Sequence, residues 1–270
     1  MSESVRAVER ALDVLLCFTR QTPELSMTQI AEQVGIHKST VHRLLATLEN
    51  KRFVQRNPDT GMYQLGIRLL QMAYLTLEQN DLRRVAAPFL RSLGELYQEN
   101  IHLAVLDDTD VVFMYIIESP QRVKLAAAIG QRLPAFATAS GKALLAFMPE
   151  KMVRRILDRG MPQFTPHTQI SSSMFFEDID FIKEQGFATS EQEYEEEINA
   201  VAAPIFDLEG QPIASIAVAG PAYRLTRERM IEIGPIVVAT ARQITQEMTV
   251  DAIPLNNSVI NGLVTRGNSK

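Results

Sequence analysis

The sequence has a single cysteine, no tryptophan, four histidines and no long apolar run. Cys17 has no second cysteine to pair with, so an internal disulfide is excluded. A membrane-spanning helix needs about 18 consecutive apolar residues, and no stretch approaches that length. The first ten residues lack the apolar core of a secretory signal. We therefore expect a protein of the reducing cytoplasm that has no membrane partner.

Few side chains in the sequence are suited to metal binding or covalent catalysis. His37, His102 and His167 are isolated, and no Ser-His-Asp or metal-ligand spacing occurs. An acidic run could suggest a hard-metal site, but consecutive side chains point in different directions, which favours a solvated loop. Its members are Glu191, Glu193, Glu195, Glu196 and Glu197. We expect no catalytic residues, no metal and no cofactor.

The net charge of −5 conceals a local excess of positive charge. Residues 36–56 carry five basic side chains and one acid, Glu49, which gives +4 within about twenty residues. Residues 67–270 carry −6. A basic patch on an acidic chain of this length is typical of a small DNA-binding module attached to a second domain.

Apolar spacing predicts three helices in the first fifty residues. Val5, Val8, Leu12 and Leu15 form one stripe on a helix that ends near residue 20. Ser26, followed three residues later by Gln29, is a capping-box pattern that begins a short second helix, which Gly35 ends. The third helix buries Val41, Leu44, Leu45 and Leu48. The glycine turn between the last two helices indicates a helix-turn-helix.

Two short β-forming runs, 53–56 and 62–65, flank the turn formers at 57–61 and predict a hairpin. A hairpin directly after three helices indicates a winged helix-turn-helix. Residues 67–80 are apolar on all sides, so we expect a connector helix that is covered by a second copy of itself.

The rest of the chain alternates between strand and helix periods. We expect strands near 101–105, 111–117, 124–129, 201–206 and 212–219, helices between and after them, and a kink or break at Gly234-Pro235 in the last helix. This pattern is α+β. The predicted organisation is a winged helix-turn-helix at 1–66, a connector and dimerisation helix at 67–80, an effector-binding domain at 81–250 and a flexible tail at 251–270.

Several segments in this order resemble the IclR family of bacterial transcription regulators. They are SMTQIA from Ser26, KSTVHRLL from Lys38, PAFATASGKALLA from Pro134, AAPIFD from Ala202 and IAVAGP from Ile216. The resemblance implies a GAF-like effector-binding domain and an assembly of homodimers that often pair into homotetramers. Thr138 to Lys142 is not a phosphate loop, because Phe136 stands where the first glycine would be.

The candidate DNA-binding residues are hydroxyl, amide and basic side chains at the two helix starts and in the wing. Short hydroxyls suit phosphate oxygens, whereas His42 and Arg43 are long enough to reach base edges. Wing residues suit backbone or minor-groove contacts. The full set is Ser26, Thr28, Lys38, Ser39, Thr40, His42, Arg43, Arg56, Asn57 and Thr60.

The effector pocket is implied by the resemblance and maps onto six positions, Ala139, Ser140, Ser190, Ala200, Ala217 and Ala219. Small residues at the first turn let a ligand approach the backbone, and the following helix offers N–H donors for a carboxylate. Members that bind small keto acids carry hydroxyls or a thiol where this chain has the last three alanines. We therefore expect a roomier, less polar pocket for a partly apolar organic acid, although these alanines could also simply pack a strand.

Together these expectations describe a ligand-responsive regulator that binds double-stranded operator DNA, a repressor of a catabolic operon, without enzymatic activity. Two alternatives remain: a small-molecule-transforming enzyme, and a protein-interaction adaptor that carries a winged helix. The first lacks paired catalytic carboxylates or an activated nucleophile, and the basic patch counts against the second.

Overall fold

The computed structural model describes residues 5–19, 21–78 and 81–252. The chain divides into two compact units, an N-terminal unit of residues 1–80 and a C-terminal unit of residues 81–270. No helix in the described ranges is both long and apolar enough to cross a bilayer.

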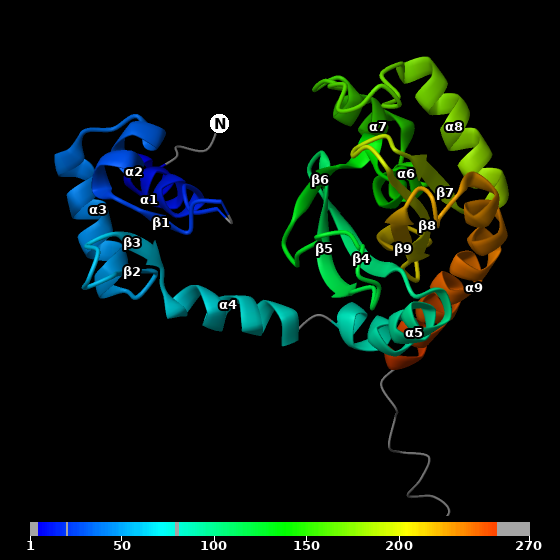
Figure 1. Cartoon of the computed structure of the whole chain (residues 1–270), viewed down its shortest axis with the longest axis horizontal. Coiled ribbons are helices and arrows are strands. Elements are labelled where there is room, and N and C mark those ends of the chain that lie inside the picture. The colour runs from blue at the N-terminus through cyan, green and yellow to red at the C-terminus, as the bar shows by residue number, and fades with distance from the viewer. Residues whose placement is uncertain (1–4, 20, 79–80, 253–270) are drawn as a thin grey trace, which may run out of the picture. The chain divides into compact units, whose positions relative to one another are not determined.

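The N-terminal unit is a helix-turn-helix with a small sheet (Figure 1). Ser26 and Gln29 form the reciprocal capping box at the start of the second helix. The three strands are antiparallel in the order β1-β3-β2. The elements are α1 (Arg6–Leu16), β1 (Glu24–Leu25), α2 (Met27–Val34), α3 (Lys38–Asn50), β2 (Val54–Arg56), β3 (Tyr63–Leu65) and α4 (Ile67–Glu78). The two-residue strand β1 was not predicted.

The core of this unit forms between the first three helices and the hairpin, around Val14, Ile30, Val41 and Leu45. The predicted apolar stripe of α1 lies largely outside this core, because Val5, Val8 and Leu12 are exposed and the buried residue of the helix is Val14. α4 also exposes apolar side chains. The unit therefore presents two helices with apolar residues in solvent.

The C-terminal unit is a six-stranded antiparallel sheet with helices on both faces, in the strand order β6-β5-β4-β9-β8-β7. The prediction of an α+β chain with an N-terminal helix-turn-helix is confirmed. The elements are α5 (Asp81–Tyr97), β4 (Asn100–Asp107), β5 (Asp110–Ile117), β6 (Arg132–Pro134), a 3-10 turn η1 (Ala135–Ala137), α6 (Ala139–Leu145), α7 (Glu150–Leu157), α8 (Ser172–Gln185), β7 (Ala188–Glu191), β8 (Ile198–Phe206), β9 (Pro212–Pro221) and α9 (Arg227–Ala252).

The two faces of this sheet carry different residues because successive side chains of a strand point to opposite sides. Ile101, Val201 and Val218 face α5 and α9, which pack together on one side (Figure 1). Ala202 and Ala217 face the opposite way, toward α6 and α8. One face is thus a dense aliphatic core, and the other is built largely from small side chains.

Two details of the predicted C-terminal unit were wrong. Residues 124–129 form no strand, because the side chain of Asn100 holds the carbonyl of Leu125 and Gln131 holds the amide of Ala128. Of the two outcomes expected at Gly234-Pro235, the break does not occur, because the last helix continues through Pro235. Gly234 lies against Phe187 where a β-carbon would be 2.5 Å from the ring, so the glycine permits close packing. Residues 253–270 of the expected tail lie outside the described residues.

Candidate functional site

The polar face of α3 is exposed and basic. Val41 and Leu45 of the same helix are fully buried, which fixes the helix so that Lys38, His42 and Arg43 project into solvent. Thr40, another predicted contact, is half-buried in the first turn. The accessible side of α3 therefore carries two cations and an imidazole, and the buried side anchors the helix in the core.

His37 caps α3, a role that the sequence analysis missed. Its Nδ1 lies 3.4 Å from the backbone N of Ser39 and 3.0 Å from Ser39 Oγ. The Ser39 hydroxyl is thus oriented by the cap, and it keeps lone pairs for a further partner. Ser, Thr, Asp and Asn are the usual N-cap residues, so the sequence alone does not indicate that His37 caps the helix that begins at Lys38.

The predicted α2 residues are less available. The Ser26 hydroxyl accepts from the Gln29 N–H at 3.3 Å and donates to Gln29 Oε1 at 2.8 Å, so the capping box occupies it. Thr28 is half-buried in the first turn. The capping box at Ser26 fixes where α2 begins.

The wing turn is held together by the residues that were predicted to contact DNA. Arg56 Nε donates to the Gly61 carbonyl at 3.0 Å, and its guanidinium lies over the Tyr63 ring. Asn57 Oδ1 accepts from the amides of Asp59 and Thr60, while its amide nitrogen donates to Glu24. Arg56 is exposed and Asn57 is half-buried, so Asn57 shapes the turn and Arg56 presents the charge.

The C-terminal unit contains a cavity of about 80 Å³ on the small-residue face of the sheet. All six predicted effector positions line it, together with His102, Phe113, Leu125, Gln131, Leu133, Thr138 and Tyr194 among others. Ala200 pairs with Ala219 across β8 and β9, two residues from the pair of Ala202 and Ala217, so these alanines share one face. Their methyl groups leave the room that larger side chains would fill.

Two hydroxyls are positioned along the wall of the cavity. Ser190 Oγ, on β7, donates to the Ala137 carbonyl at 3.4 Å. Thr138 Oγ1 caps α6 by accepting from the Gly141 N–H at 3.2 Å. A β-carbon at Gly141 would lie 2.1 Å from the Ala135 carbonyl oxygen. Gly141 thus makes room for the backbone of Ala135, whereas Ala139 and Ser140 of the same turn line the cavity, as expected.

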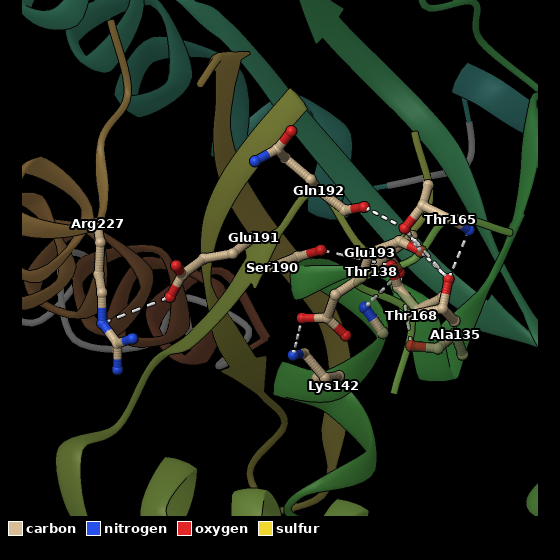
Figure 2. A network of polar contacts seen from close by, with 12 residues as sticks. Ala135, Thr138, Lys142, Thr165, Thr168, Ser190, Glu191, Gln192, Glu193 and Arg227 are labelled. Carbon is tan, nitrogen blue, oxygen red and sulfur yellow. Dashed lines mark hydrogen bonds and ion pairs between the residues drawn. The ribbon is translucent and has the colours of Figure 1, made fainter. Parts of the chain in front are cut away.

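The loop after β7 carries Tyr194 and Glu195 to the cavity, and buried polar contacts anchor it (Figure 2). Lys142 of α6 pairs with Glu193, and both side chains are buried. The hydroxyls of Thr165 and Thr168 each donate at 2.6 Å to a backbone carbonyl of the loop, at Gln192 and Glu193 respectively. Burial raises the pKa of the Glu193 carboxyl, although Lys142 opposes that shift. The loop is therefore held to α6 by the pair of Lys142 and Glu193, and to the segment before α8 by the hydroxyls of Thr165 and Thr168.

His102 of β4 lines the same cavity, although the sequence analysis treated it as an isolated histidine. It is buried, and its ring centroid is 4.4 Å from that of Phe113. Burial lowers the pKa of the imidazole to about 4, so the ring is neutral at neutral pH. Strand alternation after residue 100 could have placed His102 on the alanine face, but only once that face was known.

The acidic run does not gather at one point. Glu193 pairs with Lys142, whereas Glu191 pairs with Arg227 at 3.5 Å (Figure 2). In the described part of the chain, no three side chains of His, Cys, Asp or Glu lie together in a way that could hold a metal ion.

Comparison with known proteins extends over both units. Residues 7–58 match the IclR helix-turn-helix domain, and residues 74–246 match the family described as bacterial transcriptional regulator IclR C-terminal. The transcriptional repressor IclR of Escherichia coli K12 is 30% identical over 244 residues, which cover 89% of each chain.

Two solved structures have the same fold. An IclR transcriptional regulator from Alicyclobacillus acidocaldarius aligns with a TM-score of 0.81 at 26% identity, covering 90% of this chain and 99% of that one. An IclR homolog from Microbacterium hydrocarbonoxydans, complexed with 4-hydroxybenzoate, aligns with a TM-score of 0.76 at 24% identity, covering 89% and 99%. The matched families and curated relatives are regulators and not enzymes, which confirms the expectation that this chain is a regulator without enzymatic activity. With a helix-turn-helix unit and an effector-type unit that both match, the chain belongs to the IclR family of DNA-binding transcription regulators.

Proposed function

We propose that this regulator represses a catabolic operon and releases its operator when a small, partly apolar organic acid enters the cavity of the C-terminal unit. The repressor relative supports the sign of regulation. The observation that carries the ligand class is the cavity wall, in which alanine methyls and aliphatic side chains surround a few hydroxyls. Acting on chromosomal DNA, such a protein works in the cytoplasm.

The three alanines at 200, 217 and 219 favour apolar over polar ligand groups. A small keto acid such as pyruvate would leave its polar atoms without partners there, at about 1–3 kcal/mol each. A ligand with an apolar body fills the same space without that penalty. Ser140 remains as a polar contact for the acid group. An aromatic acid is bound in the Microbacterium hydrocarbonoxydans homolog, and that chemical class suits this wall.

The DNA contacts that we propose are Lys38, Ser39, His42 and Arg43 on α3 and Arg56 and Thr60 in the wing, because these side chains are exposed. Two exposed apolar faces support a homodimer. α1 presents Val5, Val8 and Leu12, and α4 presents Ile67, Leu70 and Leu75. Apolar surface of this kind is covered by a partner in most proteins. A twofold dimer would bind two half-sites one DNA turn apart or a multiple of it. Two such dimers would associate through their C-terminal units to form a tetramer.

The test uses the full chain. Filter binding of genomic fragments at two salt concentrations identifies the operator, and a regulator gives one specific fragment and a steep salt dependence. Titration calorimetry with keto acids and aromatic acids then identifies the ligand class, and the ligand should release the operator fragment. Tight binding of pyruvate with no response to benzoate would overturn the ligand class. Absence of any specific fragment would overturn the repressor.

A further inference from the structure

The imidazole of His102 sits in an apolar part of the cavity wall. Its strand neighbours across the sheet are Ile116 on β5 and Ala217 on β9, and its ring is tilted by 34° against that of Phe113. Only 4% of the residue is exposed.

His102 Nε2 has no hydrogen-bond partner. A buried polar atom without a partner costs stability, and such atoms in native proteins call for an explanation. In the described part of the chain, four other buried residues have a side-chain atom in this condition, Tyr97, Glu193, Asn199 and Ser215, and none of them lines the cavity. His102 is therefore the one of these five residues that belongs to the cavity wall.

The charges around the cavity favour a neutral polar group at this point. Among the described lining residues, Glu195 is the one with a formal charge, and neither lysine nor arginine is present. The pKa of His102 is lowered by burial to about 4, so the imidazole carries no charge at neutral pH. A neutral imidazole nitrogen either donates or accepts one hydrogen bond, depending on the tautomer. A hydroxyl group can serve both tautomers.

We propose that His102 is a ligand-recognition residue that hydrogen-bonds through Nε2 to a hydroxyl group on the effector. This inference rests on the proposed effector cavity and narrows its ligand to a small, ring-bearing or similarly flat compound with a hydroxyl besides its acid group. The His102 and Phe113 rings and the alanine methyls contact the apolar body. The imidazole selects for the hydroxyl.

The experiment compares ligands that differ only by a hydroxyl. Calorimetry on the full chain uses benzoate, the three monohydroxybenzoate isomers and phenol. With the wild type, we expect at least one hydroxybenzoate to bind about tenfold more tightly than benzoate, as one added hydrogen bond allows. His102→Leu should abolish that preference while benzoate binding persists. His102→Gln, whose amide reaches the position of Nε2, should restore part of it.

Ser215→Ala is the matched control, because Ser215 is also buried with a hydroxyl that has no partner but does not line the cavity. It should leave the hydroxyl preference unchanged. A hydroxyl preference that survives in His102→Leu, or no preference in the wild type, would overturn the inference. Thermal melts of each variant separate loss of recognition from loss of folding, and His102→Gln provides the comparison if the leucine variant is unstable.

Phenol separates this inference from the proposed effector class. If phenol binds in a His102-dependent way but benzoate and the hydroxybenzoates do not, the organic-acid proposal fails and the role of His102 stands. If benzoate binds and hydroxylation brings no gain, the acid class stands and the role of His102 is overturned. If no compound binds, both are overturned, and operator binding by the full chain still tests the repressor on its own.

Discussion

Lys142 and Glu193 form an ion pair that is almost entirely shielded from solvent, and this pair ties helix α6 to the loop beside the cavity. Lys142→Met should leave the carboxylate buried without its cation. We expect a loss of about 3 kcal/mol in the free energy of unfolding, the usual cost of breaking a buried pair. Urea unfolding measures it. The double variant Lys142→Met with Glu193→Gln should recover much of the loss, and equal stability of wild type and Lys142→Met would contradict this account.

The stability of the C-terminal unit should decrease in mild acid because of His102. Its pKa is lowered by burial from 6.5 to about 4, so the unfolded chain takes up a proton between these values and the folded chain does not. The contribution of His102 is thus fully present above pH 6.5 and is lost as the pH falls toward 4. The difference is about 3 kcal/mol. Carboxylates titrate in the same window, so the measurement is the pH dependence of wild type minus that of His102→Gln. Parallel curves would show that the imidazole is protonated as easily in the folded state.

Two cations of α3 should affect DNA binding differently. If Arg43 contacts a base edge, Arg43→Ala should cost about 1–3 kcal/mol on the operator and relax one base position. Lys38→Ala should weaken specific and nonspecific DNA alike and lower the salt slope by about one. Binding titrations on the operator and its single-base variants distinguish the two effects. Unchanged affinity in both variants would remove α3 from the proposed contact.

The exposed face of α4 predicts that the dimer depends on that helix. Leu70 is 65% exposed and Leu75 is 56% exposed in the single chain, so glutamate at both positions does not disturb a core within that chain. We expect monomers with weakened operator binding, detected by analytical ultracentrifugation and by band shift. The matched control is Arg68→Glu, an exposed position on the same helix that removes no apolar surface. A stable dimer with both leucines replaced would place the interface elsewhere.

Local signals predicted the three helices and the hairpin of the N-terminal unit closely because these elements are specified by nearby residues. The capping box at Ser26 and the apolar spacing from Val41 to Leu48 are read within one or two helical turns. β1 was missed because a two-residue strand at Glu24 and Leu25 exists only through its pairing with Gln64 and Tyr63. The orientation of α1 was also not predictable, since Val14 is selected by α2 and α3 and not by its own helix.

Six of the residues that line the cavity were predicted from the resemblance to the IclR family. The other lining residues were identified only from the structure. Ala200 and Ala219 come together through strand pairing between segments separated by a hairpin, which spacing alone does not specify. His102 was overlooked because a lone histidine gives no pattern in sequence. The strand expected near Leu125 does not form, because side-chain hydrogen bonds from Asn100 and Gln131 hold the backbone of this segment in an irregular path.

The division of the sheet into an aliphatic face and an alanine face has a consequence for how such a regulator can diversify. On β8 and β9, alternate residues pack against α5 and α9, and four of the residues that face the other way, Ile198, Ala200, Ala217 and Ala219, line the cavity. Replacing a methyl group by a hydroxyl or a longer chain on the cavity side leaves the packing against α5 and α9 in place. Ligand preference and fold stability thus depend on alternate residues of the same two strands. A single substitution on the cavity side can therefore change the ligand while the packing of the opposite face stays as it is.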